Sequence, residues 1–317
     1  MPGNQPTPSV APLFLGHGLR NLLIDRVTVD VFRALEADGI PAIILKGPAI
    51  ANWLYRADEV RSYGDSDLMI PHHEWEHAGR VLTGLGFQNF LASMAHPRME
   101  SYASDPWFRE GEDIDLHSTL YGIGLHPDRV WDVMSGETAR MMIAGAELPV
   151  LNEPARAMHV ALHAAQHQDG KAILDLTKAL DQLSEETWRQ ASNVAAQLDA
   201  LPAFVAGLRV DPRGLEIAKR MGLAQIRSTH TDLRAGQVPL AESLNELLET
   251  PGAAAKLRIA RAELLPNLRF MRWWSPLARR GPVGIAAAYV WRPVYIVLRA
   301  PAAVRAVWTA RRGTSRA

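Results

Sequence analysis

Residues 42–71, "AIILKGPAIANWLYRADEVRSYGDSDLMIP", decide what the sequence says about the fold. An apolar run ends at a Lys-Gly pair, and a second apolar run begins with two aspartates, Asp65 and Asp67. Two carboxylates in a buried strand are costly, because like charges repel and burial removes them from water. Side chains two apart on a strand share a face, so both aspartates project together while Ser66 points to the opposite face. The pair therefore predicts a cation-binding site.

The surrounding pattern alternates helices and strands and then becomes helical. Apolar residues at helical spacing predict a helix over 18–37, and apolar runs bounded by proline or glycine predict strands. Strands are expected within 41–47, 65–71 and 112–120, with helices over 48–55 and 72–87 between them. From about Glu153 the pattern is almost wholly helical, with the boundary near residue 150. This order predicts an α+β or α/β unit followed by an α-helical one.

Composition narrows the class of protein. The chain has 317 residues, 48% of them hydrophobic, which suits one large or two medium domains. It has no cysteine, which excludes disulfides and thiolate chemistry and fits a reducing compartment. Residues 1–16 lack the features of a signal peptide and are expected to form a flexible leader. The longest uncharged run near the C-terminus, 281–291, is shorter than the ~20 residues that span a bilayer, so we expect a cytoplasmic protein.

The C-terminal segment 264–317 is a separate electrostatic unit. It contains no acidic residue and ten arginines: Arg269, Arg272, Arg279, Arg280, Arg292, Arg299, Arg305, Arg311, Arg312 and Arg316. The arginine spacing predicts a basic amphipathic surface, interrupted as a helix by Pro293 and Pro301. Three partners are compatible with this tail: an anionic membrane surface, nucleic acid, or the acidic body of the same protein.

A second group of acids lies in the third predicted strand. Asp113, Asp115 and His117 share one face of "EDIDLH". Mg²⁺ prefers oxygen ligands and completes its shell with water and substrate phosphates. Lys46 and Gly47 form a turn before a helix, where glycine lets the backbone approach a phosphate. Strand-borne carboxylates and a phosphate-binding turn are the components of a two-metal phosphoryl or nucleotidyl transfer site.

These residues carry a resemblance to a known family. The stretch "ILKGPAIANWLYRADEVRSYGDSDLMI" resembles the uncharacterised nucleotidyltransferase family of the polymerase-beta-type nucleotidyltransferase superfamily. "DIDLHSTL" is similar to its later Asp-Leu-His segment, and "HVALHAAQH" with "ILDLTKAL" to its helical part. The resemblance covers about residues 17–185 and is most specific over 44–70. The chain departs from the broader superfamily at the Lys-Gly turn, where Gly-Ser is usual, and at Ser66, where an apolar residue is usual.

The resemblance implies a small mixed β-sheet core over 17–150, a helical domain over 151–263 and the basic tail over 264–317. It also implies a metal-dependent transfer of NMP from an NTP to a hydroxyl of a small molecule, sugar or peptide. The implied ligands of Mg²⁺ or Mn²⁺, and the implied catalytic residues, are Asp65, Asp67 and Asp115. The implied nucleotide and phosphate contacts are Lys46, Gly47 and Arg61, with Asp113 and His117 in an acceptor pocket.

Several of these residues keep a plainer alternative. Lys46 also fits a sheet-edge lysine, and Arg61 fits an ion pair with the aspartate cluster. Asp115 is preferred to Asp113 because it matches the Asp-Leu-His segment. His117 fits a core histidine as well as a residue that orients Asp115 or lines the acceptor pocket.

A histidine stripe recurs every four residues at His159, His163 and His167. A pair at this spacing can bind zinc, but the Glu of the His-Glu-x-x-His pattern is absent, which favours packing.

Two other functions stay open beside nucleotidyl transfer. One is a catalytically silent scaffold that keeps the fold, and the other is a transferase of a different phosphorylated donor group. The lack of a recognisable nucleic-acid module argues against a polymerase.

Overall fold

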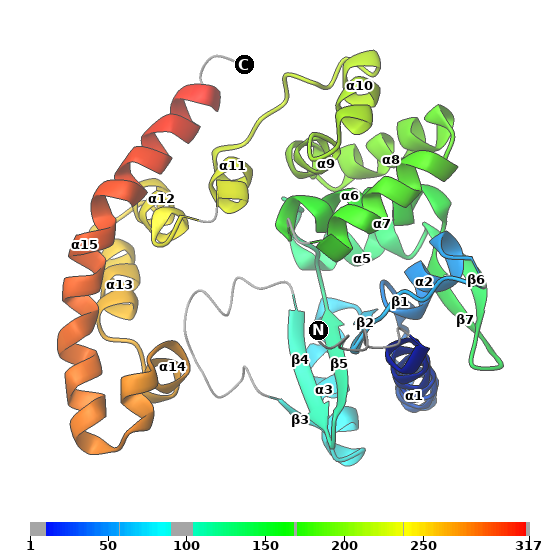
Figure 1. Cartoon of the computed structure of the whole chain (residues 1–317), viewed down its shortest axis with the longest axis horizontal. Helices are drawn as coiled ribbons and strands as arrows, with labels where there is room; N and C mark the ends of the chain where they lie inside the picture. Colours follow the sequence, from blue (N-terminus) through cyan, green and yellow to red (C-terminus); the bar gives the residue numbers. More distant parts are fainter. Residues whose placement is uncertain (1–10, 57, 90–103, 168–169, 237, 315–317) are drawn as a thin grey trace, which may run out of the picture.

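A seven-stranded mixed sheet forms the first half of the molecule (Figure 1). The computed structural model describes residues 11–56, 58–89, 104–167, 170–236 and 238–314. The strand order is β3-β4-β5-β2-β1-β7-β6. The strands are β1 (Ile43–Ile44), β2 (Asp65–Met69), β3 (Gln88–Asn89), β4 (Ser104–Arg109), β5 (Glu112–His117), β6 (Thr138–Ile143) and β7 (Ala146–Leu151).

Sixteen helical segments accompany these strands in the described part of the chain. They are α1 (Ala11–Ala37), α2 (Pro48–Leu54), η1 (His72–Glu74), α3 (Trp75–Gly84), α5 (Pro127–Met134), α6 (Glu153–Gln166), α7 (Gly170–Gln182), α8 (Glu185–Gln197), α9 (Leu201–Leu208), α10 (Pro212–Arg220), α11 (Thr229–Gly236), α12 (Ala241–Glu249), α13 (Ala253–Leu264), α14 (Leu268–Trp274), η3 (Pro276–Arg279) and α15 (Pro282–Thr314). The predicted α+β class, with a mixed sheet followed by helices, is confirmed.

The strand directions make the sheet mixed. β1 is antiparallel to β2 and parallel to β7, while β2 is parallel to β5. The remaining pairs, β3–β4, β4–β5 and β6–β7, are antiparallel. The three strands predicted from apolar runs all form, and they are the three adjacent strands β5, β2 and β1 at the middle of the sheet.

Alternation along these strands divides the core into two hydrophobic clusters. Leu68 and Ile114 belong to a cluster that includes Val31 of α1 and Leu82 of α3. Met69 belongs to the other cluster, which is built largely from α6, α8 and α9. The sheet is therefore covered by α1 and α3 on one face and by the helical region on the other.

The second cluster crosses the boundary predicted near residue 150. It contains Ile43 and Met69 from the sheet together with Met158 and Trp188 from the helices. The division into domains stays a prediction, and residues on its two sides share one core.

The N-terminal helix begins earlier than the sequence suggests. Residues 1–10 of the predicted leader lie outside the described residues, and α1 begins at Ala11 instead of residue 18. Its end at Ala37 agrees with the prediction, and its start differs because a sequence pattern defines the boundary of a helix less sharply than its middle.

The prediction that Pro293 and Pro301 interrupt the C-terminal helix is wrong. α15 runs as one helix of 33 residues with both prolines inside it. Each proline removes one backbone donor, but contacts of the buried residues Ala288, Ala303 and Val307 hold the helix on both sides of each proline.

α15 also bears on the expectation, drawn from residues 281–291, that no segment near the C-terminus is long enough to span a bilayer. Among the described residues it is the one helix long and apolar enough to cross a membrane, by length and composition alone. The sequence estimate considered only an uncharged run, whereas the helix continues through Arg292 and Arg299.

Candidate active site

The acidic residues of β2 and β5 lie side by side because these strands pair in parallel and in register. Asp65 is opposite Asp113, and Asp67 is opposite Asp115. Paired positions on neighbouring strands place their side chains on the same face. The structure thus brings together the two acidic groups that lie about fifty residues apart in the sequence.

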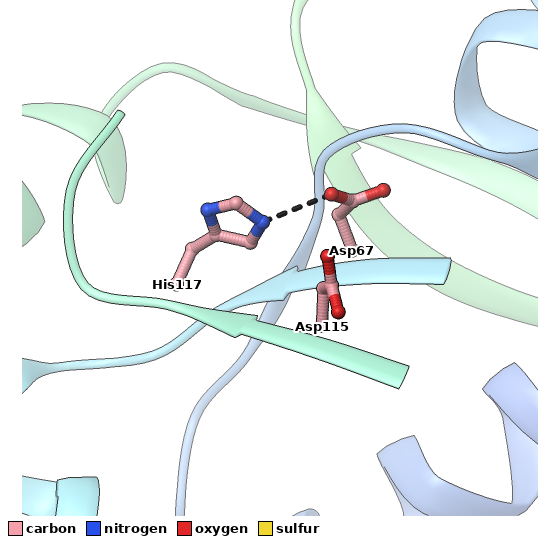
Figure 2. A group of neighbouring side chains, drawn as sticks. All are labelled: Asp67, Asp115 and His117. Carbon is pink, nitrogen blue, oxygen red and sulfur yellow. Dashed lines mark hydrogen bonds and ion pairs between the residues drawn. The ribbon is translucent and has the colours of Figure 1, made fainter. Parts of the chain in front are cut away.

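Among the described residues, the group of acidic and histidine side chains that could hold a metal ion consists of Asp67, Asp115 and His117 (Figure 2). One ligand atom from each lies within 4.8 Å of the other two. Asp67 is only 1% exposed, whereas Asp115 is half-buried and reachable from solvent. His117 Nε2 donates to Asp67 Oδ1 at 2.9 Å, and its buried Nδ1 has no partner among the described residues.

Lys46 reaches the same aspartate from the turn after β1. Its Nζ lies 2.7 Å from Asp67 Oδ1. The turn depends on Gly47, which has a φ of 62° and whose added Cβ would lie 3.0 Å from the carbonyl oxygen of Asp65. Only glycine adopts this conformation at low cost so close to another strand. Lys46 is therefore paired with Asp67 in this structure, and its ammonium group is not a free cation at the sheet edge.

The surroundings of Asp67 and Asp115 shift the pKa values of these two carboxyl groups in opposite directions. Burial alone would raise the pKa of Asp67, but the Lys46 ammonium and the His117 hydrogen bond outweigh it and hold the pKa far below its usual range. Burial and the negative charge of Asp67 raise the pKa of Asp115 to about 7. The site thus has more carboxylate than cationic charge, and a divalent cation would relieve the difference.

Asp65 and Asp113 form the neighbouring register pair on the same face of β2 and β5, two residues before Asp67 and Asp115. Both are half-buried. Burial raises the pKa of Asp113, an effect that Arg20 opposes and Asp65 reinforces. Neither residue belongs to the 4.8 Å group, in which His117 stands beside Asp67 and Asp115. A ligand role for Asp65 therefore remains a prediction.

Arg61 forms a buried ion pair with Asp175 of the helical region. It is 5% exposed, and its Nη2 lies 2.6 Å from Asp175 Oδ2 on α7. Its Nε also donates to Asp175 Oδ1 at 2.9 Å, and the Tyr55 hydroxyl donates to the same oxygen at 2.6 Å. The expected pairing with the aspartate cluster is replaced by a pairing with Asp175. Phosphate binding by Arg61 stays a prediction, and it would require this pair to open.

The histidine stripe lies behind the Lys46 turn. His159 is 4% exposed and hydrogen bonds to the backbone of Leu45. Burial, together with the nearby Lys46 charge, lowers the pKa of His159 to about 3, and burial also lowers that of His163. His167 is exposed at the end of α6. Buried and neutral, His159 fits the packing alternative.

The sequence missed two features near the site. Arg20 is exposed on α1, and its Nη2 lies 3.5 Å from the carbonyl oxygen of Gly64, beside Asp65. A cavity of about 1290 Å³ begins two residues beyond His117 and is bounded by residues 119–124, the end of α6, α11 and α12. The sequence signal for Arg20 was its solvent-facing position on a periodic helix. The cavity had none, because distant segments form it.

Comparison with known proteins places this geometry in context. Two solved structures of ANT(2'')-Ia are each 16% identical to this chain. One is a solution structure of an antibiotic-resistance factor, covering 58% of this chain and 95% of that one with a TM-score of 0.40. The other is a crystal structure with adenylyl-2''-tobramycin, covering 55% and 97% with a TM-score of 0.41.

A third similar structure is an antigenic nucleotidyltransferase-like protein from Paracoccidioides brasiliensis. It is 16% identical, covers 59% of this chain and 92% of that one, and has a TM-score of 0.34. At these levels of similarity the three structures carry no argument about the activity of this chain. No curated protein matches the sequence.

The family comparison is decisive because it covers more than half of the chain. The model of a family described as uncharacterised nucleotidyltransferase matches residues 14–212. That range contains β1, β2 and β5 with all the acidic residues described above, and it ends at the start of α10. The chain belongs to the uncharacterised nucleotidyltransferase family.

Proposed function

We propose that this protein is a metal-dependent nucleotidyltransferase that moves NMP from an NTP to a hydroxyl of a small-molecule, sugar or peptide acceptor. The observation that carries the proposal is the in-register placement of Asp67 and Asp115 on adjacent parallel strands, with Lys46 against Asp67. A scaffold protein has no need to bury an acidic pair that it must then neutralise.

The donor set fits a hard divalent cation. Asp67 and Asp115 supply carboxylate oxygens that lie within 4.8 Å of one another and of a His117 nitrogen. Asp65, on the same face, is the proposed additional ligand. A bound Mg²⁺ or Mn²⁺ supplies neutralisation of phosphate charge and lowers the pKa of a hydroxyl that it contacts.

The side chains of the chain then have distinct tasks. Asp115, half-buried and reachable from solvent beside the buried Asp67, is suited to accept the proton of the attacking hydroxyl. Lys46 is suited to contact phosphate oxygens, since its ammonium already lies at the edge of the site. The acceptor oxygen bonds to the α-phosphorus as the bond from that phosphorus to pyrophosphate breaks. His117 holds Asp67 in place through its hydrogen bond.

Substrate positions follow from the features around the acids. Arg20, exposed beside Gly64 and close enough to influence Asp113, is the proposed second phosphate contact in place of the buried Arg61. The cavity beyond β5 is the proposed acceptor site. Its lining includes Asp199, Glu246 and Glu249, so an acceptor with amino groups would be favoured.

The test of the proposed function follows the label from a donor nucleotide. Purified protein is incubated with Mg²⁺ or Mn²⁺, a small-molecule extract and each NTP labelled at the α- or the γ-phosphate. We expect label from the α-position in a new product, together with released pyrophosphate, and loss of both in Asp67→Asn.

Two results would reject the proposal. Transfer of the γ-label or of a sugar moiety would identify a transferase of another donor group. Failure of every NTP to raise the Tm with metal, in wild type and Asp67→Asn alike, would indicate a silent scaffold.

A further inference from the structure

The outward face of α15 is a continuous apolar surface with no cover among the described residues. Val283, Val290, Val297 and Val304 recur every seven residues and are 84%, 73%, 70% and 54% exposed. At 100° per residue these positions drift slowly around the helix and form one stripe. Four more exposed apolar side chains flank the stripe: Trp291, Val294, Leu298 and Trp308. A contiguous group of exposed apolar side chains on a protein surface marks an interaction site.

The opposite face of α15 is fixed to the protein. Figure 1 shows the helix running beside α12, α13 and α14, and these helices and α11 contact it. Arg292 is 2% exposed, and its Nη2 lies 3.0 Å from Glu263 Oε2 while its Nε donates to the Glu263 carbonyl at 2.6 Å. The Arg292 guanidinium also lies over the rings of Phe270 and Trp274. Crossing a membrane would break this buried pair, so α15 is suited to lie on a surface with its outward face down.

The charge of this segment selects the kind of surface. Residues 264–317 carry ten positive charges and no acid, and the neutral whole chain therefore leaves ten net negative charges on the remainder. Arg292 pairs with Glu263 of α13, and Arg311 pairs with Glu249 of α12. Arg305 and Arg312 are exposed near the apolar stripe and make no ion pair with any described residue. Arg312 lies over the ring of Trp308.

We infer that α15 docks in the plane of an anionic phospholipid membrane, its valine stripe in the interface and its arginines on the lipid phosphates. Tryptophans and arginines beside an apolar stripe are the composition of interfacial helices. A second copy of this chain is a poorer occupant, because it would bring the same acid-free, arginine-rich surface face to face with the first. The inference does not depend on the proposed enzymatic function.

Vesicle binding by the full-length protein tests the inference. The protein is sedimented with phosphatidylcholine vesicles and with vesicles containing one quarter phosphatidylglycerol. We expect at least tenfold tighter binding to the anionic vesicles, with a marked loss at high salt. Equal binding to both vesicles, or none to either, would overturn the inference.

Paired variants separate the stripe from general stickiness. Val290→Asp with Val297→Asp should reduce anionic-vesicle binding at least tenfold, whereas Met142→Asp with Leu174→Asp, at exposed apolar positions elsewhere, should not. Arg305→Glu with Arg312→Glu should remove the preference for anionic lipid. Unchanged binding in the stripe variant, in a sample whose circular dichroism matches wild type, contradicts the inference.

A measurement on the unaltered stripe covers the case in which those variants fail to fold. Lipids brominated near the headgroup end of the acyl chain should quench tryptophan fluorescence in wild type, and less so in Trp308→Phe. Light scattering that shows a stable dimer without vesicles, dissociated by the stripe variant, would identify a second copy as the occupant instead. Resistance to carbonate extraction from cells would show a spanning helix and equally reject in-plane docking.

Discussion

One oxygen of Asp67 accepts two hydrogen bonds, which explains how the fold tolerates this carboxylate although the residue is only 1% exposed. Lys46 Nζ and His117 Nε2 both bind Oδ1, at 2.7 and 2.9 Å. Asp115, one strand away, has no comparable donor among the described residues, and burial and the charge of Asp67 raise its pKa. A cation would therefore be most favourable beside Asp115, whose charge is not balanced in this way.

At the scale of residues, a metal-binding measurement distinguishes Asp115 from Asp113 as the third acidic ligand. Asp115→Asn should weaken Mn²⁺ binding at least tenfold, because it removes an oxygen from the tight group. Asp113→Asn, a matched change two residues earlier on the same face, should weaken binding less than threefold. Electron paramagnetic resonance of free Mn²⁺ measures both, and the reverse order would make Asp113 the ligand.

His159 predicts a dependence of stability on pH. Its pKa in the folded protein is about 3, below the ordinary value near 6.5. The unfolded chain therefore binds the proton first as pH falls, so stability is complete above about pH 6.5 and is lost progressively toward pH 3. Between pH 7 and pH 5 this one residue costs about 2 kcal/mol.

Urea unfolding at pH 7 and pH 5 checks that sign. His159→Gln should lose about 2 kcal/mol less than wild type over this interval. His73→Gln, at an exposed histidine, should behave as wild type. An equal acid loss in wild type and His159→Gln would show that His159 does not remain neutral in the folded state.

At the scale of elements, a buried ion pair joins the sheet region to α7. Arg61, between α2 and β2, binds Asp175 of α7, and Tyr55 at the end of α2 donates to the same carboxylate. Lys178 of α7 adds an ion pair to Glu59 at 2.7 Å. These contacts fix the segment that leads into β2 and thereby the start of the Asp-x-Asp strand.

Breaking this pair from one side should be costly. Asp175→Asn leaves the buried Arg61 guanidinium without its counter-charge and should reduce the free energy of unfolding by about 3–5 kcal/mol. Removing the exposed Lys219–Glu216 pair through Lys219→Ala should cost less than about 1 kcal/mol. Chemical denaturation measures both, and a small loss in Asp175→Asn would mean that Arg61 is free to serve another partner, such as phosphate.

At the scale of the whole molecule, the sheet and the helices α6 to α9 share one core. Ile43 and Met69 of the sheet pack in the same cluster as Met158 and Trp188. The later helices have small clusters of their own, one of which contains Leu233 of α11 and Val307 of α15. The sheet and these helices therefore pack as one unit, and the division into domains near residue 150 stays a prediction.

Truncation tests this division. Residues 11–150 alone would expose the face of the sheet that α6 covers, and we expect no cooperative unfolding transition from them. Residues 11–226 keep the complete cluster and should unfold cooperatively. Near-ultraviolet circular dichroism against urea compares the two fragments. A cooperative transition in the shorter one would support the boundary near 150.

The sequence by itself determined the local chemistry of this protein. Apolar runs ending at glycine and proline predicted β1, β2 and β5, and alternation put Asp65, Asp67, Asp113 and Asp115 on shared faces, because these patterns depend only on backbone geometry. It also predicted the Gly47 turn, which only a residue without Cβ can form beside Asp65. Family membership followed from the same residues.

Only the tertiary structure decided which of these residues meet. Lys46 on Asp67, Arg61 on Asp175, Arg20 beside Gly64 and the continuity of α15 through two prolines all depend on packing between distant segments. A one-dimensional pattern gives the face on which a side chain lies, but not the partner that covers it. Pairings across the fold are set by burial and shape, and these exist only once the chain is packed.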